Sequence, residues 1–231
     1  KRLLMRGIII AMDGYAGTGK SSTAKEVAKA LKYRYIDSGA MYRCVTRHFI
    51  DHQVDLENEG QVEVALNQLV IKFNFNEALN QSEILLNDRV MDKEIRLPEI
   101  NEAVSKISAN PIVRKKLVVM QQQLGTQKDI VMDGRDICTV VFPEAELKIF
   151  MSANLDIRSQ RRFDETKAKN IKVDFEEIKQ NLADRDHLDT TRQDSPLMKA
   201  KGAIEIDTSY LTFQEQVDKI MEYANQLIYA S

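Results

Sequence analysis

The sequence predicts an α/β protein: a three-layer fold around a five-stranded parallel sheet, with a small antiparallel sheet inserted into the chain. Two observations predict the parallel sheet. Short apolar runs recur along the chain and end in Gly, Asp or Ser, and most are followed by segments with helical spacing of apolar residues. A third observation predicts the insertion, because apolar and polar residues alternate in part of the region from residue 66 to residue 91.

Composition narrows the class of protein. The 231 residues are 43% hydrophobic and 29% charged, with a formal net charge of −2. This composition is typical of a globular protein. The small negative net charge argues against a nucleic-acid polymer as a partner. Cys44 and Cys138 lie far apart without a C-x-x-C motif, which indicates neither a disulfide framework nor a zinc site and favours a reducing cytoplasm.

The start of the chain superficially resembles a signal peptide, because Lys1 and Arg2 precede apolar residues. Arg6 and Asp13 interrupt that pattern and no small-residue cleavage site follows, so a strand is the better interpretation. No other segment approaches the length that spans a membrane. A monomer is the default expectation.

The first predicted strand, Ile8 to Met12, leads into G-Y-A-G-T-G-K-S, which fits the Walker A pattern G-x-x-x-x-G-K-[ST]. Its glycines allow backbone amides to surround a phosphate, and the helix that follows to Leu31 directs free N–H groups at the same anion. Lys20 suits the β- and γ-phosphates of ATP and Ser21 suits Mg²⁺. The alternative is a plain glycine-rich turn. The predicted donor-binding residues are Gly14, Tyr15, Ala16, Gly17, Thr18, Gly19, Lys20, Ser21 and Ser22.

A second strand, Tyr33 to Ile36, leads into D-S-G-A-M-Y-R, where we expect Ser38 to cap a helix that carries Arg43. Ligands bind at the carboxyl ends of parallel strands, so Ser38 and Arg43 are expected near the Walker A motif. The alternative is an ordinary cap and a surface arginine.

The pattern of apolar and polar residues changes after a polar helical connection at residues 51–64. Residues 71–75 and 82–86 read as strands, with a turn at 87–88 before Val90. This is the predicted small antiparallel sheet, from about residue 66 to residue 91.

Two helices follow the inserted sheet. The first begins after Pro98, and Asn110 with Pro111 ends it and opens the second. Arg114 lies in the first turn of that second helix, against the helix dipole, which suggests a binding role although a surface arginine is the commoner explanation.

The run from Ile130 to Asp133 resembles a Walker B strand, whose terminal carboxylate reaches the magnesium shell. Gly134 lets the chain turn, and Arg135 and Asp136 then stand at the carboxyl end of the sheet. An Asp- and Gly-rich turn without function is the alternative. Strands at 147–151 and 203–207 complete the five.

Arg158, Arg161 and Arg162 fall at helical spacing on one face, where like charges repel unless an anion lies between them. We expect them to clamp transferring phosphates. The alternative is a solvated face whose arginines pair with nearby acidic residues, namely Asp156, Asp164 and Glu165.

A helix from Asp174 carries an apolar stripe that continues as charged residues, which indicates a site or a buried ion pair if the helix persists past Thr190 and Thr191. The stripe comprises Phe175, Ile178, Leu182, Arg185, Asp189 and Arg192. His48, His52 and His187 have no metal-binding spacing. The segment from Thr212 predicts a packed amphipathic helix.

Taken together, G-x-x-x-x-G-K-S, D-S-G-A-M-Y-R, M-D-G-R-D-I-C-T-V-V-F-P and R-D-x-x-D-x-x-R-x-x-x-P-L resemble bacterial cytidylate kinase over essentially the whole chain. The chain departs from that family at Tyr15, where Pro is frequent, and at Cys138, where Gly is usual. The resemblance implies one P-loop domain over 1–231. Its parts would be a core (about 5–50, 128–155 and 200–231), an acceptor-nucleotide subdomain (about 51–127) and a short helical lid (about 156–175).

The resemblance also implies transfer of the γ-phosphoryl group of ATP, with Mg²⁺, to CMP or dCMP. It places the acceptor phosphate on Arg43 and Arg135, the sugar on Arg185 and Asp189, and cytosine on Ser105, Arg114, Asp136 and Arg192, with Ser38 nearby. Physics favours CMP over UMP, because the Asp136 carboxylate accepts from an amino group that uracil lacks. Lys20, Asp133 and the three clustered arginines would be the catalytic residues.

Two alternatives stay open. Another nucleoside monophosphate kinase, for UMP or AMP, would share the P-loop, although D-G-R-D and the inserted sheet argue against it. A non-catalytic P-loop regulator is the other, and its GTPase form would need an N-K-x-D motif that the sequence lacks.

Overall fold

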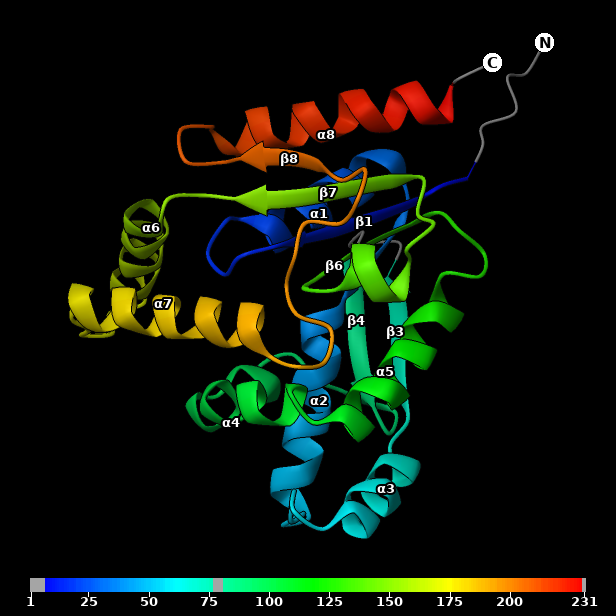
Figure 1. The fold of residues 1–231 in the computed structure, drawn as a ribbon, viewed down its shortest axis with the longest axis vertical. Coiled ribbons are helices and arrows are strands. Elements are labelled where there is room, and N and C mark those ends of the chain that lie inside the picture. The colour runs from blue at the N-terminus through cyan, green and yellow to red at the C-terminus, as the bar shows by residue number, and fades with distance from the viewer. Residues whose placement is uncertain (1–6, 77–80, 230–231) are drawn as a thin grey trace. The chain divides into compact units, whose positions relative to one another are not determined.

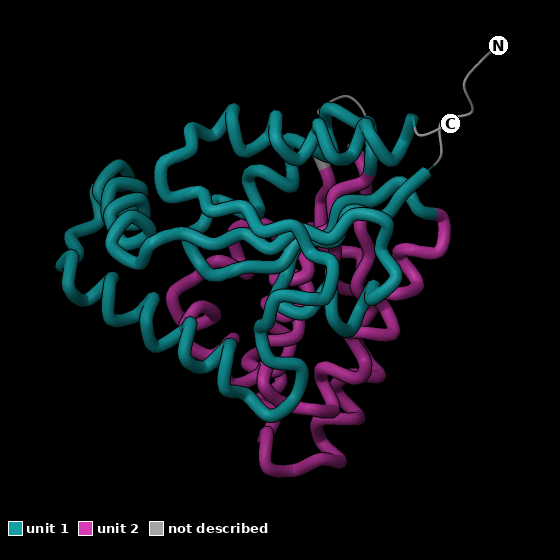
Figure 2. Tube along the Cα trace, turned by 45° about the horizontal axis from the view of Figure 1, so that its top comes forward, with its two compact units in different colours: residues 1–33, 128–231 teal, residues 34–127 magenta. Residues whose placement is uncertain are grey.

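The computed structural model describes residues 7–76 and 81–229, so the start of the chain that resembles a signal peptide lies outside the described residues. The chain forms two compact units (Figure 2): residues 1–33 with 128–231, called the P-loop unit below, and residues 34–127, called the inserted unit. Among the described residues, no helix combines the length and the apolar character needed to cross a membrane.

Strands and helices are interspersed along the chain (Figure 1). The strands are β1 Ile9–Gly14, β2 Arg34–Asp37, β3 Ile71–Asn76, β4 Gln81–Leu86, β5 Arg89–Val90, β6 Ile130–Gly134, β7 Leu147–Ser152 and β8 Ile204–Asp207. The helices are α1 Lys20–Leu31, α2 Ser38–Asp51, α3 Glu59–Gln68, α4 Pro98–Ser108, α5 Pro111–Leu124, α6 Leu155–Ala168, α7 Phe175–Thr191 and α8 Phe213–Ile228. Two short helices are η1 Glu94–Arg96 and η2 Ile137–Val141.

The predicted five-stranded sheet is confirmed, in the order β2-β6-β1-β7-β8. Strand β1 is central and pairs in parallel with β6 on one side and β7 on the other, so Met12 lies opposite Asp133 and Ile149. Strand β8 pairs in parallel with β7. Because these strands run in one direction, the ends of β1, β6 and β7 that lead into the motifs meet at one edge of the sheet.

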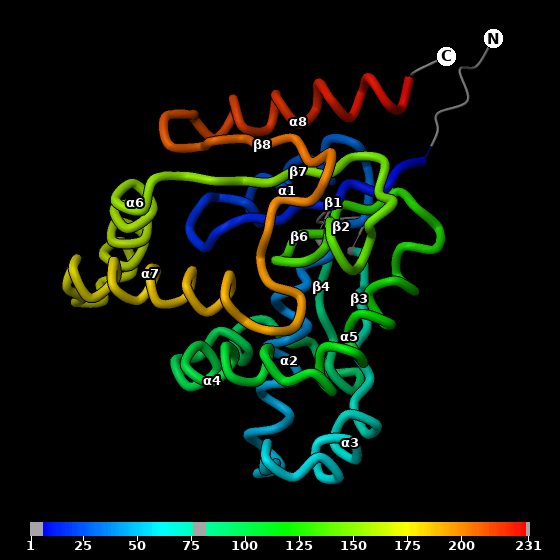
Figure 3. Tube along the Cα trace, viewed as in Figure 1, coloured from blue at the N-terminus to red at the C-terminus, as the bar shows by residue number. Residues whose placement is uncertain are grey.

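In the P-loop unit, α1 packs against β1, β6 and α8, and α8 also packs against β7. Figure 3 shows that α1 and α8, from opposite ends of the chain, lie side by side. A buried hydrogen bond joins the Thr23 hydroxyl to the Gln216 side chain across this pair, at 3.1 Å. The predicted C-terminal helix is confirmed, and a capping box between Thr212 and Glu215 begins it.

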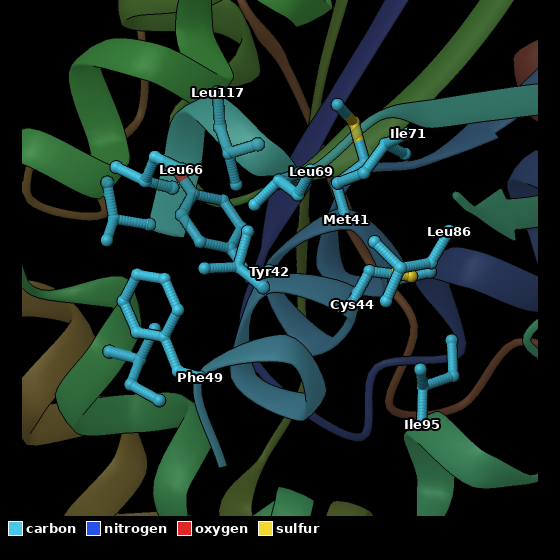
Figure 4. Packing of buried hydrophobic residues seen from close by; sticks show 14 of the residues in the cluster. Met41, Tyr42, Cys44, Phe49, Leu66, Leu69, Ile71, Leu86, Ile95 and Leu117 are labelled. Atoms are coloured by element: carbon cyan, nitrogen blue, oxygen red, sulfur yellow. The ribbon is translucent and has the colours of Figure 1, made fainter. Parts of the chain in front are cut away.

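The inserted unit contains the predicted antiparallel sheet, in the order β3-β4-β5. Phe73 lies opposite Ile84, so apolar residues face each other across the pair. The sheet shares one apolar core with the helices (Figure 4), to which α2 contributes Met41, Tyr42 and Phe49. These contacts cover the apolar faces that β3 and β4 could not bury alone.

The ends of the helices agree with the sequence-based expectations in some places and differ in others. Asp37, and not Ser38, caps α2: its carboxylate accepts from the Ala40 N–H at 2.9 Å, and Ser38 is the first helical residue. The expected cap of α5 by Asn110, with Pro111 following, is confirmed. Helix α7 persists through Thr190 and Thr191, whose hydroxyls bond back to carbonyls one turn earlier. The short helices η1 and η2 were not predicted.

Candidate functional site

The Walker A segment joins the end of β1 to the start of α1. Gly14 has φ of 152°, and a Cβ there would lie 2.1 Å from the Met151 carbonyl oxygen of β7. Gly19, with φ of 84°, is the N-cap residue of α1 and supplies no side-chain cap. The first N–H groups of α1 are therefore left without a side-chain acceptor, which is the arrangement that binds anions.

Lys20 and Ser21 both contact one carboxylate oxygen at the end of β6. The Lys20 Nζ lies 3.0 Å from Asp133 Oδ2, and the Ser21 hydroxyl donates to the same oxygen at 2.7 Å. Lys20 is 6% exposed and Asp133 2% exposed. Burial lowers the pKa of Lys20, while the Asp133 charge opposes that shift. The Walker A lysine and the carboxylate at the end of β6 thus lie together within the P-loop unit.

The same contact provides a test of the magnesium prediction. A carboxylate and a hydroxyl oxygen lie together beside the anion-binding end of α1. Mg²⁺ prefers such oxygen ligands, with one or two carboxylates and the rest from phosphate and water. The donor set therefore fits Mg²⁺. Within residues 7–76 and 81–229, no group of three or more His, Cys, Asp or Glu side chains forms a separate metal cluster.

Arg135, directly after β6, is held by α7. Its Nε donates to Asp189 Oδ2 at 2.7 Å, and Arg192 approaches the other oxygen of Asp189 at 3.7 Å. Burial alone would lower the pKa of Arg135, but Asp189, together with the charges of Asp133 and Asp13, outweighs it and the pKa is raised. Burial likewise would raise the pKa of Asp189, and Arg135 holds it below its usual range. Asp189 and Arg192, which continue the α7 stripe, thus form an ion-pair cluster with Arg135. A buried ion pair is one of the two explanations that the inward-facing pattern suggested.

Two further predicted residues belong to this end of α7. Arg185 is half-buried on the helix, and its positive charge also acts on Asp189. Arg192, at the C-terminal end of α7, donates from Nε to the Ser195 carbonyl at 2.9 Å. The P-loop unit therefore brings Arg135, Asp189 and Arg192 together, with Arg185 acting on the same carboxylate.

The three predicted clamp arginines on α6 have different surroundings. Arg158 is 5% exposed, donates to the Ala16 carbonyl in the Walker A segment at 3.0 Å and pairs with Asp186 of α7 at 2.7 Å. Arg161 donates to the Thr208 hydroxyl after β8 at 3.2 Å. Arg162 is exposed and pairs with Glu165. Glu165 is one of the acidic partners named in the alternative interpretation, so the pair that it forms with Arg162 fits that alternative. The clamp stays a prediction.

Four predicted residues lie in the inserted unit. Ser38 is buried at the start of α2, and Arg43 on the same helix donates to the Asn101 side chain. Arg114 is 2% exposed, donates to the Ser108 carbonyl at 3.0 Å and lies 5.7 Å from the centre of the Tyr42 ring. Ser105 is half-buried on α4. The expected nearness of Ser38 and Arg43 to the Walker A segment stays a prediction, as do the base-binding roles of Ser105 and Arg114.

Sequence reasoning passed over two acidic residues that the structure places in this network. Asp13 ends the apolar run of β1, and Asp186 pairs with Arg158. One sequence signal could have identified Asp13: a carboxylate inside an otherwise apolar central strand must be buried, so it requires donors nearby. Asp186 lies outside the apolar stripe of α7 and gave no such signal.

Comparisons with known proteins agree on one family. A family model described as cytidylate kinase matches residues 10–226. A cytidylate kinase of Flavobacterium johnsoniae is 47% identical over 227 residues, covering 97% of this chain and 99% of that protein. One from Cytophaga hutchinsonii is 48% identical over 220 residues, covering 95% and 94%. A crystal structure of an uncharacterized protein from Eubacterium ventriosum covers 96% of this chain and 99% of its own, with a TM-score of 0.52 at 12% identity, and this likeness concerns the fold alone.

Proposed function

The chain belongs to the cytidylate kinase family, and we propose that it transfers the γ-phosphoryl group of ATP to CMP or dCMP, giving ADP and CDP or dCDP. One observation carries the proposal beyond family membership. Lys20 and Ser21 of the Walker A segment meet Asp133 at 3.0 and 2.7 Å, which is the set of groups that phosphoryl transfer from a nucleoside triphosphate requires.

On the donor side, the residues from Gly14 to Ser22 hold the ATP phosphates, with Lys20 on the β- and γ-phosphates. Ser21 and Asp133 would hold Mg²⁺, which when bound offsets negative charge on those phosphates. Lys20 is paired with Asp133, so its ammonium is held at the start of α1. Preorganisation of this kind reduces the reorganisation needed when the phosphates bind.

On the acceptor side, Arg43 and Arg135 bind the phosphate of CMP, and Arg185 and Asp189 bind the sugar. Ser105, Arg114, Asp136 and Arg192 read cytosine, with Ser38 nearby. Asp136 is 4% exposed, so its carboxylate is costly to leave without a hydrogen-bond donor. Cytosine supplies an amino group, whereas uracil would present a carbonyl oxygen, and this mismatch favours CMP over UMP.

The reaction needs no strong general base, because the acceptor phosphate is itself a nucleophile. Catalysis consists of in-line positioning and charge neutralisation by Lys20 and the α6 arginines Arg158, Arg161 and Arg162. We assign residues 156–175 to a lid that excludes water and residues 51–127 to an acceptor subdomain, within one domain over 1–231 whose core is about 5–50, 128–155 and 200–231. A cytoplasmic monomer that acts on small nucleotides, without nucleic-acid polymer or membrane, fits this role.

The test is a coupled assay of ADP formation with ATP, Mg²⁺ and each of CMP, dCMP, UMP and AMP. Turnover largely confined to CMP and dCMP is the expected result. A preference for UMP or AMP would keep the fold and overturn the roles of Asp136 and Arg192. The absence of any acceptor-dependent ADP formation would reduce the proposal to a nucleotide-binding protein.

A further inference from the structure

Asp13 is the last residue but one of β1 and directly precedes the first glycine of the Walker A segment. Its side chain is fully buried, at 0% exposure, in the centre of the five-stranded sheet. Strand β1 pairs with β6 and β7 on its two sides, so the backbone of Asp13 is opposite Gly134 and Phe150. A buried carboxylate is costly unless hydrogen bonds satisfy it, and none of the donor or acceptor roles above uses Asp13.

The carboxylate satisfies the start of η2. Its two oxygens accept from the backbone N–H groups of Ile137 at 2.9 Å and Cys138 at 2.8 Å. These are the first two residues of η2, whose N–H groups have no acceptor within their own helix. The Cys138 thiol adds a third contact to β1, because its Sγ lies 3.3 Å from the Ala11 carbonyl. The η2 segment is therefore fixed to the central strand.

This contact matters because two acceptor-binding residues lie directly before η2 in the chain. Asp136 is the residue before η2, and its carbonyl accepts from the N–H groups of Val140 and Val141. Arg135 comes one residue earlier. A shift of η2 relative to β1 therefore moves the backbone of Arg135 and Asp136, the two acceptor-binding residues that follow β6. The Walker A segment begins at Gly14, directly after Asp13 in the chain.

The charge of Asp13 is consistent with such a role. Burial raises its pKa to about 6, and the N–H groups of Cys138 and Ile137 oppose that rise. When ionised, the Asp13 carboxylate acts through its charge on both Lys20 and Arg135. Hydrogen bonds from N–H groups to a carboxylate are shorter and stronger than neutral ones, which suits a fixed joint.

We propose that Asp13 is a positioning residue that holds the start of η2 against β1 and thereby sets the place of Arg135 and Asp136 for the acceptor nucleotide. Asp13 touches no substrate and acts through these two residues. The inference rests on the proposed function, since it assumes that Arg135 and Asp136 bind the acceptor. It predicts that substitution of Asp13 weakens binding of the acceptor and selectivity for its base more than it weakens binding of ATP.

The test compares Asp13→Asn with a matched control, Glu146→Gln. Asparagine keeps the size of the side chain and one acceptor oxygen, but its amide group cannot accept from the second N–H. Glu146 also accepts from a β1 backbone N–H, that of Ile9 at 2.9 Å, but at the opposite end of the strand. Glu146 itself lies directly before β7. Both substitutions therefore change a carboxylate into an amide at a contact that involves β1.

Steady-state kinetics give the first readout. Asp13→Asn is expected to raise the KM for CMP about tenfold, to narrow the kcat/KM ratio of CMP over UMP, and to leave the KM for ATP within about twofold. Glu146→Gln is expected to leave all three near wild-type values. An unchanged KM for CMP and unchanged selectivity, or an equal rise in both KM values, would overturn the positioning role.

Hydrogen exchange gives a second readout that does not depend on activity. Peptides that cover residues 135–141 are expected to exchange about tenfold faster in Asp13→Asn, with no change in Glu146→Gln. If the wild type fails to phosphorylate CMP but this difference appears, the proposed function fails and the joint between β1 and η2 stands. Equal exchange in the two variants would contradict the joint itself.

A folding defect leaves the inference testable. Asp13→Ser is smaller, is neutral and keeps one acceptor oxygen, so it replaces Asp13→Asn in both experiments if that variant does not fold. Wild-type kinetics and exchange in Asp13→Ser would overturn the proposal. Failure of both variants to fold would also overturn it, because Asp13 would then serve the fold as a whole.

Discussion

The two units differ in what they bury. The P-loop unit buries five charged side chains among its described residues, namely Asp13, Lys20, Asp133, Asp136 and Arg158. The described part of the inserted unit buries a single one, Arg114, beside an apolar core that includes Phe49 and Leu117. In the P-loop unit, opposite charges and backbone groups compensate the cost of burial, whereas in the inserted unit apolar contacts supply the stability.

This difference separates catalysis from stability. Replacement of both partners of a buried ion pair often costs little stability, and loss of one partner is tolerated best where hydrogen bonds still satisfy the other. Loss of a large apolar side chain from a packed core costs several kcal/mol. We therefore expect single substitutions in the P-loop unit to change turnover first. Substitutions in the core of the inserted unit should change the free energy of unfolding first.

The largest expected effect is that of Lys20→Met on turnover. Loss of the ammonium removes charge stabilisation of the transferring phosphoryl group, and kcat should fall about 10³-fold or more. Asp133 keeps its hydrogen bond from Ser21, so the unfolding temperature should stay close to that of the wild type. The coupled ADP assay and a thermal melt measure the two quantities.

The control for this variant is Lys25→Met, because Lys25 is an exposed lysine on the same helix α1. It should behave as the wild type in both measurements. Near-normal turnover in Lys20→Met would contradict the assignment of the Walker A lysine.

Phe49→Ala should have the next largest effect, on stability. Phe49 is 2% exposed in the core of the inserted unit, and its truncation should lower the free energy of unfolding by about 3–4 kcal/mol. Denaturant titration measures the change. Phe75→Ala, in β3 of the same unit, is the matched control, since Phe75 is 37% exposed and its loss should cost far less. Equal losses in the two variants would contradict the position of this core.

The smallest expected effect concerns His48, a titratable side chain buried beside that core. Its Nε2 lies 3.1 Å from the Ala65 carbonyl oxygen, and burial lowers its pKa, with a smaller contribution from His52. Between pH 7 and pH 5 the unfolded chain therefore takes up a proton near pH 6.5 that the folded chain resists. The free energy of unfolding should fall as the pH falls through that range.

His48→Gln keeps a donor for the carbonyl but does not titrate, so it should lose less stability on acidification than the wild type. Denaturant titrations at pH 7 and pH 5 measure the difference. His187→Gln, at an exposed histidine, is the matched control and should lose as much stability between pH 7 and pH 5 as the wild type does. A steeper loss in His48→Gln would show that the sign is wrong.

The sequence predicted the elements well because their patterns are local. The β1 run, the Walker A spacing and the period-two alternation at Ile71 and Phe73 depend only on neighbouring residues, and the structure confirms the strands they imply. The helix start at Asn110 and Pro111 followed from local capping chemistry in the same way. The resemblance to bacterial cytidylate kinase, which rested on the sequence motifs, is likewise confirmed by the comparisons.

What the sequence did not predict depends on contacts between distant residues. Arg158 reaches the Ala16 carbonyl, which is 142 positions away, and Asp13 reaches the N–H of Ile137 across 124 positions. Spacing on one helix placed three arginines on one face but could not show that neighbouring elements supply each with a different partner. The cap at Asp37 was missed for a simpler reason, since Asp37 and Ser38 are both good caps and the choice depends on backbone torsion.

Gly14 has a consequence for any selection on this chain. A side chain at this position would meet the backbone of β7, at 2.1 Å from the Met151 carbonyl, before it met any phosphate. A library randomised from residue 14 to residue 21 and screened only for folded protein should therefore still return glycine at position 14. At Lys20 the same screen should accept many residues. Sequence invariance within this motif would then have two separate origins, one in the packing of strands and one in the chemistry of ATP.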